Sequence, residues 1–261
     1  MKPVVRYILG GILVLAFLST CVFAAVQSRR DRSVLTCEGL EIEFADSLRF
    51  LSEDDIISLV MHHYGPYVGQ RLDSIKLFRL EEILLSQSSV SGCEAWTTRD
   101  GILHLSVQQR NPVVKFCKGR VTLLCDSRGF MFPQAGKKVD GIPVVKGNLP
   151  LSVEASYRGE AASVNERLWV SGVLNLLEFC RTERNWRRKV EKEMEVLPGG
   201  DICIRLKGGG ERFILGSPDD IEEKFSRIEK YLGWIRPHVD EGCYRTVNVK
   251  YNKQIICRKD I

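Results

Sequence analysis

The chain has 261 residues, of which 44% are hydrophobic and 27% are charged, and its formal net charge is +5. The hydrophobic content is ordinary for a globular chain that buries a core. The mildly basic charge fits a solvated surface better than a nucleic-acid-binding surface, so no nucleic acid is expected as a partner. The nine cysteines include no C-x-x-C pair and no Cys/His spacing of a zinc site. Disulfide connectivity, for example between Cys37 and Cys93, stays open.

An uncharged apolar stretch lies near the N-terminus, over residues 8–26. Its nineteen residues are enough for a helix to cross a hydrocarbon core of roughly 30 Å, whereas the apolar part of a signal peptide usually has about 7–15. We predict a single transmembrane helix over 8–26, preceded by a short tail over 1–7. The alternatives are a cleaved signal peptide, with its cleavage region at 22–25, and a lipid anchor at Cys21.

Basic residues flank this stretch on both sides. Lys2 and Arg6 precede it. Arg29, Arg30 and Arg32 follow it. Counting Lys and Arg slightly favours a cytoplasmic C-terminal side, but the free amino terminus adds one positive charge in front. Charge alone therefore leaves the orientation open.

The next part of the sequence predicts a compact α+β domain over 34–111. Alternating apolar residues predict a strand over 35–44. Two segments with apolar residues at helical spacing follow, at 51–64 and 72–90. A hairpin with a Gly-containing turn is predicted over 93–110. Two helices on one face of a small sheet would make a βααββ unit.

Pro112 marks the start of a second, β-rich domain, predicted over 112–258. Strands separated by glycine turns are predicted over 113–133, and a short strand over 141–147. Apolar residues at helical spacing predict a helix over 163–180. The mainly antiparallel sheet of this domain is thus expected to carry flanking helices.

The last third of the sequence continues the same pattern. Three strands separated by glycine-rich turns are predicted over 189–217. A helix is predicted over 217–235, with Ser217 as its N-cap and Pro218 at its first position. A single closing strand with alternating apolar residues is predicted over 244–259.

No catalytic, nucleotide-binding or metal-site motif occurs in the sequence. His62 and His63 are adjacent, so they point to different sides of a helix and make a poor chelate. Asp54 and Asp55 are explained by the favourable charge at a helix N-terminus. The basic run over 181–189 is typical of a solvated helix end. We therefore expect no catalytic residue, metal or cofactor, and binding as the role; an unrecognised hydrolase site is an alternative.

The closing strand is the best candidate for a binding surface. If it lies at a sheet edge, its unpaired N–H and C=O groups are a template for another chain. Lys250 and Lys253 support a second interpretation, in which edge charges block such pairing. The residues alone leave both interpretations open.

The order of these elements resembles the FtsQ/DivIB family of cell-division proteins: a short tail, one span, a POTRA-type module and a β-rich domain ending in an exposed strand. Residues 88–113 resemble the family's POTRA hairpin and Arg-x-Pro junction. Asp126 and Gly129 resemble its Asp-x-x-Gly turn. Residues 208–232 are similar to its strand, Leu-Gly pair and long helix, and 247–258 to its closing strand.

The resemblance implies a non-enzymatic bitopic scaffold of the division septum, with its N-terminus in the cytoplasm, one span in the inner membrane and its bulk in the periplasm. It implies FtsB/FtsL-type coiled-coil partners, other membrane division proteins bound through the POTRA-like module, and a link between septum assembly and cell-wall synthesis. The partner is expected to add a strand along Thr246, Val247, Asn248, Val249, Lys250 and Tyr251. The preceding helix is expected to wall the same site through Phe225, Ile228 and Tyr231.

A POTRA-bearing envelope export or outer-membrane assembly factor is the alternative function. Such a protein would hold client chains by strand addition. These proteins usually repeat the POTRA module or end in a membrane barrel, whereas this sequence shows one POTRA-like unit. The division scaffold is therefore the preferred hypothesis.

Overall fold

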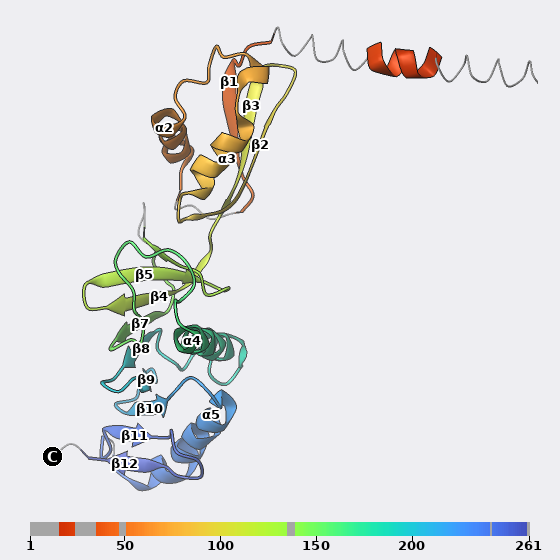
Figure 1. The fold of residues 1–261 in the computed structure, drawn as a ribbon. Coiled ribbons are helices and arrows are strands. Elements are labelled where there is room, and N and C mark those ends of the chain that lie inside the picture. Colours follow the sequence, from red (N-terminus) through yellow and green to blue (C-terminus); the bar gives the residue numbers. More distant parts are fainter. Residues whose placement is uncertain (1–15, 24–34, 47–50, 135–138, 241, 260–261) are drawn as a thin grey trace, which may run out of the picture. The chain divides into compact units, whose positions relative to one another are not determined.

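A computed structural model of the chain describes residues 16–23, 35–46, 51–134, 139–240 and 242–259. The chain divides into two compact units, Met1–Gln109 and Arg110–Ile261. Each unit has its own cluster of buried hydrophobic side chains. Figure 1 shows the elements of each unit.

The predicted transmembrane helix falls largely outside the described residues. Of residues 8–26, only 16–23 are described, and these are helical. Among the described residues, no helix combines the length and the apolar character needed to cross a membrane.

The described residues between 35 and 109 in the N-terminal unit form a three-stranded sheet and two α-helices. Its elements are β1 (Gly39–Phe44), α2 (Glu53–His63), the 3₁₀ turn Leu72–Ser74, α3 (Leu77–Leu85), β2 (Val90–Thr97) and β3 (Ile102–Gln109). The sheet order is β1-β3-β2, with β1 parallel and β2 antiparallel to β3. This arrangement confirms the predicted βααββ order.

Local sequence signals define the helices of this unit. Ser52 and Asp55 form a capping box at the start of α2, in which the Ser52 N–H donates to the Asp55 carboxylate at 2.9 Å. Gly65, with φ of +99°, takes the left-handed conformation that follows the end of this helix. On α3, Leu80 and Leu84 are fully buried and contribute to the core.

The C-terminal unit contains a nine-stranded sheet among its described residues. Its strands are β4 (Pro112–Lys118), β5 (Val121–Asp126), β6 (Met131–Pro133), β7 (Val144–Gly147), β8 (Glu193–Val196), β9 (Ile202–Arg205), β10 (Arg212–Gly216), β11 (Thr246–Asn248) and β12 (Ile256–Arg258). They lie in the order β12-β11-β10-β9-β8-β7-β4-β5-β6. Five of the eight pairings are antiparallel, so the predicted antiparallel-rich sheet is confirmed.

Two helices, α4 (Val164–Thr182) and α5 (Ile221–Lys230), lie on the same side of this sheet (Figure 1). An aromatic cluster joins them. The Phe225 ring of α5 lies 4.9 Å from the Phe179 ring of α4 and 4.8 Å from the Trp186 ring that follows it. Burial of such rings is among the larger contributions to a core.

The predicted start of α5 is wrong by a turn. Ser217 is not its N-cap; the helix begins at Ile221 after Asp220, whose φ is +41°. The buried Lys224 ammonium donates to the Ser217 carbonyl at 2.8 Å, to the Asp219 carbonyl at 2.7 Å and to the Asp219 carboxylate. A buried ammonium needs these acceptors, and satisfying them holds the preceding loop out of the helix.

Candidate docking surface

Strand β11 is internal to the sheet. Val247 lies opposite Phe213 in the parallel pairing with β10 and opposite Cys257 in the antiparallel pairing with β12. The prediction that Thr246–Tyr251 forms an exposed edge strand is therefore wrong. The chain turns back after β11 and returns as β12, so its own next segment occupies the pairing position.

A buried guanidinium determines where β11 ends. Arg227 of α5 donates from Nε to the Val249 carbonyl oxygen at 2.9 Å, and the Val249 N–H donates to the Ile214 carbonyl at 3.0 Å. The Lys250 N–H donates to the Asn248 side-chain oxygen at 3.0 Å. Because the Val249 carbonyl faces α5, it cannot continue a ladder with β12.

Lys250, predicted to meet a partner, is already paired within the fold. Its Nζ lies 2.7 Å from the Asp201 carboxylate and 5.2 Å from the centre of the Tyr251 ring. The hydrogen bond to Asp201 raises the pKa of Lys250. A charged partner residue would have to compete with Asp201 for this ammonium.

The predicted wall of the site is part of the core instead. Phe225, Ile228 and Tyr231 are all buried and belong to the hydrophobic cluster of this unit. Trp234 has the opposite environment, since it is 80% exposed. It lies in a π-helical turn, Tyr231–Ile235, that continues α5. In the sequence, Trp234 lies outside the apolar stripe of its helix, and this position indicates an exposed side chain.

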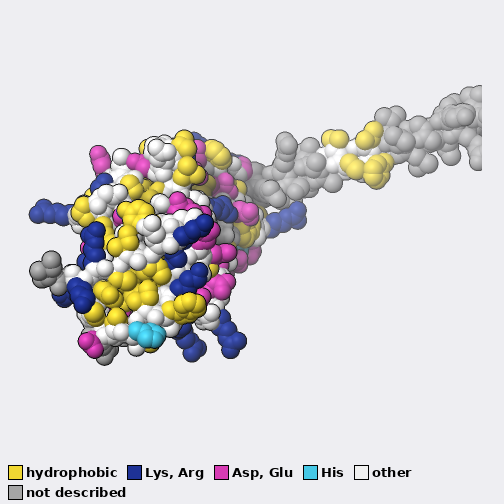
Figure 2. Space-filling view, turned by 90° about the horizontal axis from the view of Figure 1, so that it is seen from below, with side chains coloured by type: hydrophobic (Ala, Val, Ile, Leu, Met, Phe, Trp, Pro, Cys, Tyr) yellow, Lys and Arg dark blue, Asp and Glu magenta, His cyan; other side chains and the backbone are white. Residues whose placement is uncertain are grey.

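The open edge of the sheet is β12, which pairs with β11 on one side only among the described residues. Ile256 on this strand is 36% exposed, and Tyr251 in the preceding turn is 47% exposed. We call the outer edge of β12 together with Tyr251 and Ile256 the C-terminal docking surface. Figure 2 faces this end of the unit and shows hydrophobic side chains gathered among Lys and Arg side chains.

Basic residues surround this surface. Four exposed cationic side chains lie on β12 and on the segments that flank it: Arg245, Lys253, Arg258 and Lys259. Apolar centres with charged rims are the usual composition of protein–protein interfaces. The sign of this rim favours a neutral or acidic partner.

Two other sheet edges, at β6 and β1, are less suited to strand addition. On the outer side of β6, Met131 and Gly159 exchange two backbone hydrogen bonds of 2.8 and 3.0 Å, and Pro133 lacks an N–H. In the N-terminal unit, Glu41 and Glu43 place charges on the edge strand β1. Such charges discourage pairing with another chain.

Titratable groups near the docking surface have structural roles. The Tyr231 hydroxyl lies 3.4 Å from the buried Glu211 carboxylate, and Arg236 Nε lies 3.1 Å from the same group. Burial raises the pKa of the Cys257 thiol, so it is a weak nucleophile. Among the described residues, no three His, Cys, Asp or Glu side chains are grouped to hold a metal ion.

Comparison with known proteins assigns both units. A model of a POTRA-like domain matches residues 35–108, and the model described as FtsQ/DivIB, C-terminal related matches residues 111–258. No curated protein is similar enough to the chain to count as a match. The second match covers more than half of the 261 residues. The family predicted from the sequence is confirmed: the chain belongs to the FtsQ/DivIB family of cell-division proteins.

Proposed function

We propose that this protein is a non-enzymatic scaffold of the division machinery that captures a partner polypeptide by strand addition at β12. A division-related scaffold role follows from the two family matches. The observation that carries the mechanism is the one-sided pairing of β12 at the end of a nine-stranded sheet. An incoming strand would gain main-chain hydrogen bonds there, and its side chains would meet Tyr251 and Ile256.

The proposed partners are FtsB/FtsL-type coiled-coil division proteins. Family membership supports this class of partner. The exposed Trp234 is the strongest candidate anchor, because tryptophan is enriched among residues that dominate binding energy. Through such partners the protein would connect septum assembly with cell-wall synthesis.

The proposed location is the inner membrane at the division septum. The apolar stretch 8–26 supports a single span, with the N-terminus in the cytoplasm and both folded units in the periplasm. Anchoring on one membrane raises the effective concentration of partners held in the same membrane. The POTRA-like unit would then bind other membrane division proteins.

One pair of variants tests the docking mechanism. In full-length protein in maltoside micelles, Ile256→Glu should weaken binding of the organism's FtsB/FtsL-type partner by about tenfold or more, because a charge enters the apolar centre. Asn165→Glu adds the same charge on exposed α4 and should change the affinity less than about twofold. Equal affinities in two folded variants would remove β12 from the mechanism.

Location needs separate experiments. A fluorescent fusion should form a band at midcell, whereas a uniform envelope signal would contradict a septal role. A reporter fused at Ile261 that is active only outside the cytoplasm should be active. An inactive reporter would refute the proposed orientation.

A further inference from the structure

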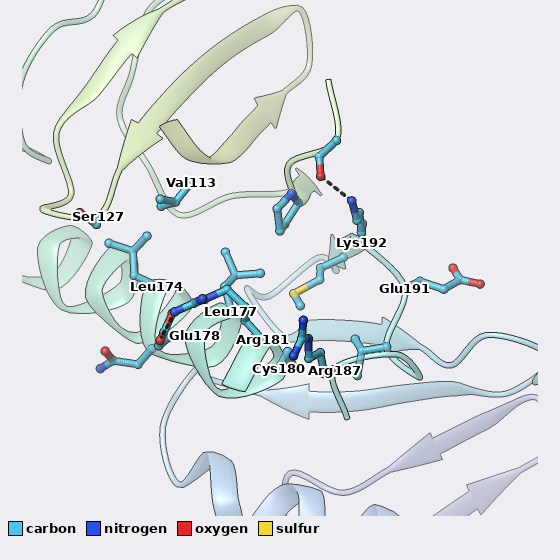
Figure 3. Close-up of a pocket in the computed structure, with 15 residues that line it drawn as sticks. Val113, Ser127, Leu174, Leu177, Glu178, Cys180, Arg181, Arg187, Glu191 and Lys192 are labelled. Atoms are coloured by element: carbon cyan, nitrogen blue, oxygen red, sulfur yellow. Dashed lines mark hydrogen bonds and ion pairs between the residues drawn. The ribbon is translucent and has the colours of Figure 1, made fainter. Parts of the chain in front are cut away.

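A second binding feature lies in the C-terminal unit, away from β12. A cleft of about 580 Å³ opens between α4 and the strands β4 and β8 (Figure 3). Its walls include Val113 of β4, Leu174 and Leu177 of α4, and Met194 of β8. In the sheet, β9, β10 and β11 separate β8 from β12, so this cleft is distinct from the C-terminal docking surface.

The cleft opens beside a cation-rich segment. Residues 181–189 contain four arginines and one lysine but a single acidic residue, Glu183. Trp186 in the middle of this segment is buried against Phe225, which fixes the segment to the core. A chain segment held in this way presents its charges in fixed positions.

The cationic side chains at the mouth of the cleft differ in whether a hydrogen bond or an ion pair already engages them. Arg181 makes two hydrogen bonds, of 2.9 and 2.6 Å, with the Glu178 carboxylate. Lys192 Nζ donates to the Gly141 carbonyl at 2.5 Å (Figure 3). Arg187 lines the cleft and is exposed, and within the described residues no ion pair or hydrogen bond engages its guanidinium. An anion placed in the cleft would therefore find Arg187 available.

The rest of the lining is mostly apolar, with Ser127 and Asn175 as its uncharged polar members. Glu191 also lines the cleft, but its carboxylate points away from Leu174 and Leu177 (Figure 3). Burial raises the pKa of the Cys180 thiol to about 12, so this wall residue stays neutral at physiological pH. From Leu174 to Arg181, α4 advances by about 10 Å along the cleft. An extended chain covers that length with three or four residues at about 3.3 Å each.

We propose that this cleft binds a short, extended, acidic segment of a partner polypeptide. One or two large apolar side chains would fill the space between Val113, Leu174 and Leu177, and a following carboxylate would pair with Arg187. The combination of an apolar recess with an unpaired guanidinium at its mouth selects this chemistry. Binding in this cleft is independent of strand addition at β12.

A direct binding measurement tests the proposal. The probe is a fluorescein-labelled tetrapeptide, Leu-Phe-Asp-Glu, titrated with the full-length protein in maltoside micelles and followed by fluorescence polarisation. We expect saturable binding with a dissociation constant below about 1 mM. The peptides Leu-Phe-Lys-Lys and Gly-Gly-Asp-Glu should each bind about tenfold more weakly or worse, because one lacks the anion and the other the apolar groups.

A matched pair of variants locates the binding. Arg187→Glu should weaken binding of the tetrapeptide by about tenfold or more. Arg184→Glu, the same charge change in the same exposed segment but outside the lining, should change binding less than about twofold. Equal effects of the two variants, no saturable binding, or equal binding of Gly-Gly-Asp-Glu would overturn the proposal. Complete displacement by octanoate at lower concentrations than by unlabelled peptide would assign the cleft to a small amphiphilic anion instead.

Discussion

Removing the Arg227 guanidinium tests how the docking surface is supported. Arg227 is buried, and its Nε donates to the carbonyl oxygen of Val249, which is also fully buried. The variant Arg227→Met keeps an unbranched apolar side chain but leaves that carbonyl without its charged donor. Hydrogen bonds to charged groups contribute about 1.5–3 kcal/mol, and an orphaned buried acceptor costs a comparable amount. We therefore expect the C-terminal unit to lose about 2 kcal/mol of unfolding free energy.

The assay is urea unfolding of the full-length protein, followed by hydrogen exchange at the amides of β11 and β12. Arg205→Met is the matched control, because Arg205 is exposed on β9 and its loss should cost less than about 0.5 kcal/mol. Exchange should accelerate at Val249 and along β12 in Arg227→Met, since these groups depend on the same hydrogen bond. If the two variants lose equal stability, the Arg227 guanidinium does not hold the end of β11.

Three further predictions concern pH, backbone and binding. Burial raises the pKa of the Cys125 thiol to about 12 from an ordinary value near 9. The neutral thiol therefore contributes its full stability below pH 9, and this contribution is lost as pH rises through 12, with a loss on the order of 2–3 kcal/mol at pH 11. The unfolding free energy of Cys125→Ala, measured against pH in the alkaline range, should lack this decrease. Gly147→Ala should destabilise the C-terminal unit by at least about 2 kcal/mol in urea, because Gly147 has φ of +110° and an added Cβ would overlap the Val196 carbonyl; a smaller loss would contradict that close approach. Trp234→Ala should weaken partner binding by about tenfold in titration calorimetry and leave the melting temperature unchanged, and a lowered melting temperature would show that the indole supports the fold instead.

Local signals in the sequence were sufficient for much of the fold. The capping box at Ser52 and the alternation along β3 depend on residues that are neighbours in the chain, so they can be read directly. The order strand, helix, helix, strand, strand then leaves few ways to form a compact unit. The family resemblance added the identity of the module, which composition alone does not contain.

The docking surface could be predicted only in part, because it depends on contacts between distant residues. The alternation over Thr246–Tyr251 is the same for an edge strand and an internal strand, and pairing with β12 decides between them. The strand ends early because Arg227, 22 positions away, takes the Val249 carbonyl. The position of Trp234 off the apolar stripe of its helix is visible in the sequence, but the π-helical turn in which it lies is not.

The two ends of the nine-stranded sheet differ in a way that limits how copies of this protein can assemble. Among the residues that the structure describes, the Met131–Gly159 hydrogen bonds close the β6 end and leave the edge beside β12 open to a further strand. Head-to-tail growth through the sheet requires two open sheet edges on each molecule. Among the described residues, this sheet has one open edge, at β12. Pairing through the sheet therefore stops after one addition, which favours a complex of fixed stoichiometry over a filament.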